Sequence, residues 1–122
     1  MYIASPPALS WIKCDGNQWC SLLTVNLSHP HFQGLEGVYI VWHGGSSPWT
    51  VYVGQGVIRD RIAAHRIDKD ILQFSHLGLF VTWAQVEAQW RDGIERFLAD
   101  RLQPKVGVAH PAVAPISVNL PW

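Results

Sequence analysis

Two short apolar stretches, residues 38–42 and 51–53, are rich in β-branched and aromatic side chains. A loop that contains glycine, serine and proline, residues 43–48, joins them. Apolar stretches separated by turn-forming residues in this way are typical of a β-hairpin. Beyond the second stretch the hydrophobic period changes from two residues to about 3.6, which places Ile58 and Ile62 one helical turn apart. The pattern therefore predicts a hairpin that is followed directly by a helix.

The later part of the chain continues this mixed pattern. Residues 79–83 read as a third strand, and a short irregular or helical connection, residues 68–78, precedes them. Residues 89–102 are expected to form an amphipathic helix, whose apolar face consists of Trp90, Ile94, Phe97, Leu98 and Leu102. Pro104 ends this helix. These elements predict an α/β (α+β) fold with a small three-stranded, mainly antiparallel sheet flanked by helices.

The flanking segments are less regular than this central part. Residues 1–36 are expected to form an N-terminal extension packed on the domain, in which residues 19–27 alternate in part and predict an extra strand or a covering arm. Residues 37–107 form the domain itself. Residues 108–122 contain three prolines, at 111, 115 and 121, and therefore predict an extended tail that lies as an edge strand or tucks against the body. With 122 residues the chain is long enough for one core.

Composition and charge limit what the chain can bind. An apolar share of 48% with 15% charged residues indicates a compact folded chain. Nine basic and nine acidic side chains give a net charge of zero, which argues against long-range electrostatic capture of a nucleic acid. A local basic cluster nevertheless surrounds the first predicted helix, comprising Arg59, Arg61, Arg66 and Lys69, and it is diluted by Asp60, Asp68 and Asp70.

The two cysteines, Cys14 and Cys20, bear on the compartment. The sequence has no apolar run of about 18 residues, and its start resembles no secretory signal, so we expect a cytoplasmic protein without a membrane segment and with both thiols reduced. His29 and His31 lie close enough in sequence to complete a zinc site with them. The gap between the two cysteines fits a structural zinc site poorly, so free cysteines and surface histidines are the preferred interpretation.

Four polar residues lie at positions suited to a catalytic site. Tyr39 and Tyr52 fall on the two hairpin strands, each near a glycine, and Arg61 and His65 are one turn apart on the following helix. Taken singly, each is explained as a half-buried packing residue, with the arginine stem lying along the apolar surface.

The combination resembles the GIY-YIG nuclease family. Residues 37–39 read Gly-Val-Tyr where that family has Gly-Ile-Tyr, and residues 52–54 read Tyr-Val-Gly where it has Tyr-Ile-Gly. The family then has an arginine and, one turn later, a histidine or tyrosine, which Arg61 and His65 match. A strand and a helix with a metal-binding glutamate follow in the family, and Glu95 stands at that position.

The resemblance implies a metal-dependent endonuclease that hydrolyses phosphodiester bonds in nucleic acid, with DNA the favoured substrate. Glu95 would hold one Mg²⁺ or Mn²⁺ ion. Arg61 would contact the scissile phosphate. Tyr39 would act as general base, with Tyr52 and His65 orienting it or relaying its proton. A tyrosine with an ordinary pKa near ~10 is a poor base at neutral pH, so His65 is the alternative base, and the sequence leaves both open.

Further residues bear on substrate binding and on the alternative function. Arg59, Arg66 and Lys69 are expected to contact nucleic acid, and Trp42 could stack on an exposed base or, alternatively, fill the core. Gly107 stands where the family commonly has an asparagine that helps to hold the active site. This departure and the neutral charge keep a second interpretation open: a catalytically weak or inactive module of the same fold that binds nucleic acid or a protein partner.

Overall fold

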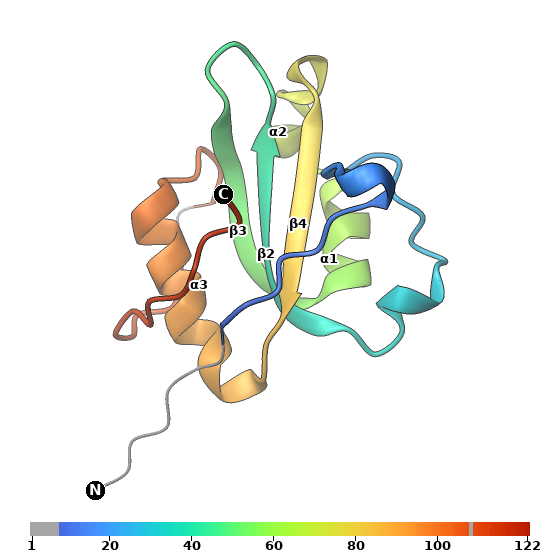
Figure 1. The fold of residues 1–122 in the computed structure, drawn as a ribbon. Coiled ribbons are helices and arrows are strands. Elements are labelled where there is room, and N and C mark those ends of the chain that lie inside the picture. Colours follow the sequence, from blue (N-terminus) through green and yellow to red (C-terminus); the bar gives the residue numbers. More distant parts are fainter. Residues whose placement is uncertain (1–7, 108) are drawn as a thin grey trace, which may run out of the picture.

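The computed structural model describes residues 8–107 and 109–122 and shows an antiparallel sheet with helices on both sides (Figure 1). The sheet has four strands in the order β1-β4-β2-β3. In chain order the elements are η1 (Asp15–Asn17), β1 (Cys20–Ser21), η2 (Pro30–Phe32), β2 (Glu36–His43), β3 (Trp49–Val57), α1 (Ile58–His65), α2 (Lys69–Leu72), η3 (Ser75–Leu77), β4 (Leu79–Gln85) and α3 (Ala88–Leu102), where η marks a short 3-10 helix.

The α+β class is confirmed, and the number of strands is corrected from three to four. The additional strand is β1, which pairs with β4 and extends the sheet beyond the predicted three strands. It lies within residues 19–27, where an extra strand was one of the two expectations. Because β1 has two residues, it is too short to give a period-two signal of its own.

Each face of the sheet carries its own core. Helix α1 packs on one face and α3 on the other (Figure 1). The core on the α1 side includes Tyr39, Val41, Val51, Ile58, Ile62 and Trp83. The core on the α3 side includes Val38, Ile40, Trp42, Val53, Ile94 and Leu98. Successive residues of β2 therefore alternate between the two cores, as the pleat of a strand requires.

A β-bulge in the hairpin places the side chains of Tyr39 and Tyr52 on the same face of the sheet. Val41 pairs with Tyr52, but the next residue, Trp42, pairs with Thr50, so that Val51 is an extra residue on β3. Val51 and Tyr52 consequently both lie toward the α1 core although they are adjacent in sequence. The bulge keeps Tyr52 on the face of Tyr39 while Trp42 and Thr50 lie on the opposite face.

The N-terminal extension corrects the expectation for the cysteines. Cys14 and Cys20 form a disulfide, with their Cα atoms 5.1 Å apart. The chain reverses between them, because Gly16 and Asn17 adopt positive φ and the Cys14 N–H donates to the Gln18 carbonyl. This reversal brings the two Cα atoms within the usual disulfide distance, which their separation in sequence does not reveal. The prediction of two reduced thiols is therefore wrong, and with the thiols paired the zinc alternative also falls.

The prediction of reduced thiols was based on a cytoplasmic location, and that location stays a prediction. The disulfide argues against it, because disulfides persist mainly in oxidising surroundings. Among residues 8–107 and 109–122, the structure has no helix with the length and apolar character needed to cross a bilayer.

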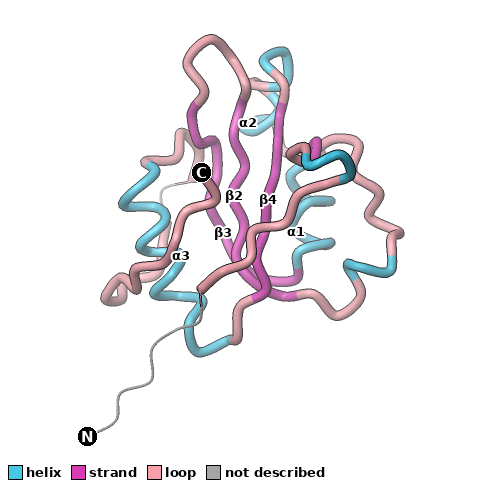
Figure 2. Tube along the Cα trace, in the orientation of Figure 1, coloured by secondary structure: helices cyan, strands magenta, loops and turns pink. Residues whose placement is uncertain are grey.

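The C-terminal tail tucks against the body and forms no strand in its described part, residues 109–122 (Figure 2). The Ile116 N–H donates to the Gly93 carbonyl of α3 at 2.9 Å. Asn119 pairs with the backbone of Leu9 through two hydrogen bonds of 2.8 and 2.9 Å, which hold the tail beside the N-terminal segment. Of the two expectations for the tail, the packed one is confirmed.

Candidate functional site

The Tyr39 hydroxyl is the centre of the predicted site. Its side chain is fully buried on β2, under α1. The phenol oxygen lies 2.6 Å from Nε2 of His65, and the Nε–H of Arg61 donates to it at 3.3 Å. These two partners come from consecutive turns of α1, as the spacing of four residues predicts. Tyr39, Arg61 and His65 therefore form one hydrogen-bonded cluster.

The proton positions in this cluster follow from which groups can donate. Arginine has no acceptor, so the Tyr39 oxygen accepts from Arg61, and its own O–H is free to donate to His65. We assign Nε2 of His65 as the unprotonated ring nitrogen, which accepts from this O–H. Burial, followed by the charge of Arg61, lowers the pKa of His65 to about 4, so the ring is neutral at pH 7. We assign the proton of the neutral ring to Nδ1.

Burial has the opposite effect on the Tyr39 phenol. It raises the pKa of Tyr39 above its ordinary value, while the hydrogen bond and charge of Arg61 lower it in part. The same hydrogen bond raises the pKa of Arg61. The resting site is therefore a protonated phenol held between a guanidinium ion and a neutral imidazole.

Tyr52 completes this side of the site. Its ring is stacked on that of Tyr39, with centroids 6.1 Å apart and an angle of 13° between the planes. The Tyr52 ring also lies 4.5 Å from the His65 ring, centroid to centroid. The four residues that the resemblance implied for the hairpin and the first helix are thus brought together.

Two glycines make room for the tyrosines. A Cβ atom at position 54 would lie 2.5 Å from the Tyr39 hydroxyl oxygen, so only glycine allows this ring to occupy its place. Gly107 has φ of +84°, and a Cβ there would lie 2.9 Å from the Tyr52 ring. An asparagine at position 107 would collide with Tyr52, which accounts for the glycine at this position.

Glu95 lies on α3, on the opposite side of the sheet from the Tyr39 cluster. It is mostly buried, and its Oε2 is 3.4 Å from Nδ1 of His110 in the tail. Burial raises the pKa of Glu95, and hydrogen bonds with His110 and Gln55 oppose that shift. Its negative charge is the smallest of the causes that act on the pKa of Tyr39, and no hydrogen bond joins the carboxylate to the Tyr39 cluster among the described residues.

The residues predicted to bind nucleic acid are dispersed. Arg66 donates from Nε and Nη2 to the carbonyls of Leu22 and Val25, so these two donors hold the N-terminal extension against α1. Lys69 is exposed at the start of α2. Nε of Arg59 is buried without a hydrogen-bond partner among the described residues.

Trp42, the fourth of these predicted residues, is almost buried on the α3 face, away from the tyrosines.

His110 is the residue that sequence reasoning missed. It lies in a proline-rich segment 15 positions after Glu95, and no local pattern marks it. No cluster of three or more histidine, cysteine, aspartate or glutamate side chains suited to a metal ion occurs within the described part of the chain. Glu95 alone would supply one carboxylate to a hard cation, which would take the rest of its ligands from water.

Similarity to known proteins adds no support to the assignment of this site. Comparisons with protein-family models, with curated proteins and with solved structures gave no match to this chain.

Proposed function

We propose that the chain is a metal-dependent endonuclease with a GIY-YIG-like site, acting on nucleic acid and on DNA in preference to RNA. The observation that supports this most strongly is the buried Tyr39 hydroxyl, held 2.6 Å from a neutral His65 and 3.3 Å from Arg61. A purely structural tyrosine needs one hydrogen-bond partner, and a hydroxyl placed between a cation and a free base is arranged for proton transfer.

The proposed proton path uses both candidate bases. Tyr39 is fully buried in this structure, so the path requires that the attacking water gain access to the phenol; the Tyr39 oxygen would then take a proton from that water while its own proton passes to Nε2 of His65. Because the raised pKa of Tyr39 disfavours a free phenolate, the two transfers occur together. Arg61 stabilises negative charge on the phenol oxygen and directs its remaining guanidinium donors to the phosphate.

Glu95 is the residue that would hold the metal ion. Its Oε1 and Oε2 oxygens suit Mg²⁺ or Mn²⁺, and His110 keeps the carboxylate in place through the contact at 3.4 Å. A bound ion would supply charge stabilisation at the phosphate and at the leaving oxygen.

The second candidate function is that of a module that binds nucleic acid or a protein without cleaving. It is favoured by the net charge of zero and by the Arg61 Nε, which is already engaged by Tyr39. Such a module would bind equally well in the presence of EDTA and would release no product.

The test is cleavage of plasmid DNA, single-stranded DNA and RNA with Mg²⁺ or Mn²⁺, compared with EDTA. We expect metal-dependent cleavage that Glu95→Gln abolishes while the fold survives. Glu87→Gln is the matched control, because Glu87 is exposed and precedes the same helix. Equal rates for the parent and Glu95→Gln would overturn the proposal.

A further inference from the structure

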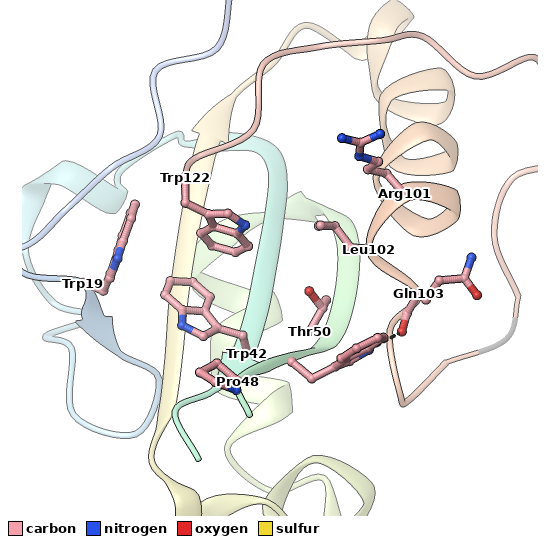
Figure 3. Close-up of a pocket in the computed structure, with 9 residues that line it drawn as sticks. Trp19, Trp42, Pro48, Thr50, Arg101, Leu102, Gln103 and Trp122 are labelled. Atoms are coloured by element: carbon pink, nitrogen blue, oxygen red, sulfur yellow. Dashed lines mark hydrogen bonds between the residues drawn. The ribbon is translucent and has the colours of Figure 1, made fainter. Parts of the chain in front are cut away.

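Four of the seven tryptophans converge on one groove that the catalytic proposal does not use (Figure 3). The groove has a volume of about 480 Å³, within the range of roughly 300–1,000 Å³ that is usual for ligand sites. Its aromatic residues come from separate parts of the chain, namely Trp19, Trp42, Trp49 and Trp122. The groove lies on the α3 side of the sheet, where Trp42 belongs to the core.

The aromatic surface is both anchored and exposed. Trp42 packs edge to face against Trp19 and Trp122, with ring centroids 5.3 and 5.0 Å away, and these contacts fix the two rings. Trp122 remains 58% exposed and Trp49 47% exposed. Large aromatic rings that are fixed on one side and open on the other are stacking platforms for flat ligands.

The groove offers several hydrogen-bond donors, beside the acceptor oxygens of Thr50 and Gln103. The indole N–H groups of Trp19, Trp42 and Trp122 make no hydrogen bond to any residue within 8–107 or 109–122. The guanidinium of Arg101, at the end of α3, and the Thr50 hydroxyl also line it (Figure 3). Phosphate oxygens and the acceptor atoms of base edges would match these donors.

The charge around the groove is positive in a chain whose net charge is zero. Arg101 lines it and no acidic residue does. The Lys105 ammonium lies 5.3 Å from the centre of the Trp49 ring. This arrangement favours an anionic ligand over a neutral proline-rich peptide, which aromatic grooves also bind.

We infer that this groove, called here the tryptophan groove, binds an unpaired segment of nucleic acid by stacking its bases on Trp49 and Trp122. A duplex is excluded as the stacked ligand because its base faces are already covered by neighbouring bases. The inference rests on the proposed function, since it makes the substrate a nucleic acid with single-stranded character. Thr50 in the groove and Tyr52 beside Tyr39 are two residues apart on β3, and the bulge at Val51 places them on opposite faces of the sheet.

The test measures binding without cleavage. The Glu95→Gln chain in EDTA is titrated with an oligodeoxythymidine of about 12 nucleotides, within the ~4–16 nucleotides of comparable single-strand sites, and tryptophan fluorescence is followed. We expect quenching, weaker binding at higher salt, and much weaker binding of a duplex of equal length. A proline-rich peptide of similar length should leave the fluorescence unchanged.

Two substitutions localise the binding. Trp122→Leu should weaken oligonucleotide binding about 5- to 150-fold, the effect of losing one base stack. Trp90→Leu is the matched control, because Trp90 is only partly exposed on α3 and does not line the groove. Circular dichroism and thermal unfolding verify that both variants fold. If Trp122→Leu does not fold, Trp49→Leu is tested in its place.

The result that overturns the inference is equal binding by the parent and the groove variants, tighter binding of the duplex, or binding of the peptide instead. The outcome is separate from that of the nuclease proposal. If oligonucleotide binding depends on the groove but the parent chain cleaves nothing with Mg²⁺ or Mn²⁺, the endonuclease fails and the groove stands. If cleavage occurs and the groove variants bind normally, the groove fails alone.

Discussion

Acidification should destabilise this protein through His65. The ring is neutral in the folded chain, with its pKa lowered from 6.5 to about 4 by burial and by the charge of Arg61. The unfolded chain therefore binds a proton at this residue between pH 6.5 and about 4, where the folded chain does not. The free energy of unfolding rises with pH wherever the unfolded state holds more protons, so stability is lost as the pH falls through this window.

The size of the effect follows from the two pKa values. A difference from 6.5 to about 4 corresponds to up to about 3 kcal/mol in total, of which about 2 kcal/mol is lost between pH 7 and pH 5. Below the folded pKa both states are protonated, and the loss ends. Glu95 acts in the opposite direction, because its raised pKa favours the folded state at low pH and this advantage is lost as the pH rises through the folded pKa.

The assay is urea unfolding at pH 7 and at pH 5 for the parent, His65→Gln and His76→Gln. Glutamine at position 65 keeps an acceptor for the Tyr39 hydroxyl but does not titrate, and His76 is an exposed control. Glu95 is common to the three chains and cancels in the comparison. The parent and His76→Gln should each lose about 2 kcal/mol more than His65→Gln. Equal losses in all three would refute the idea that His65 is buried as a neutral base.

Three more predictions concern packing and covalent structure. Gly54→Ala places a methyl group 2.5 Å from the Tyr39 hydroxyl oxygen, and urea unfolding should show a loss of about 1–3 kcal/mol; an unchanged midpoint would contradict the close packing. Gly107→Ala forces a side chain into φ of +84° against the Tyr52 ring, so calorimetry should show a lower Tm, by an amount equivalent to about 1–2 kcal/mol. Reducing the Cys14–Cys20 disulfide, which joins residues 6 positions apart, should lower the free energy of unfolding by about 2 kcal/mol. A thiol assay that finds two free thiols in the untreated native chain would disprove the pairing.

Local periodicity was sufficient to predict the central elements. The hairpin, α1, β4 and α3 each carry a hydrophobic pattern within one segment, and the structure places them close to the predicted ranges. The same local order placed Arg61 and His65 on one face of α1, where both contact Tyr39.

The features that the sequence did not reveal depend on contacts between distant segments. β1 is defined by its pairing with β4, and the disulfide by a chain reversal inside the extension. The bulge at Val51 is a matter of register, which no residue type in β3 signals. His110 and Trp122 reach their partners only because the tail folds back along α3 and beside Leu9.

The central claim is that the Tyr39 hydroxyl passes a proton between water and His65. The most direct measurement is the single-turnover cleavage rate of a DNA substrate with Mn²⁺ for the parent and for Tyr39→Phe, after urea unfolding has shown that the variant is folded. We predict a rate about 10²- to 10⁴-fold lower for Tyr39→Phe, the usual loss when a general base is removed. A folded Tyr39→Phe chain that cleaves as fast as the parent would contradict the claim.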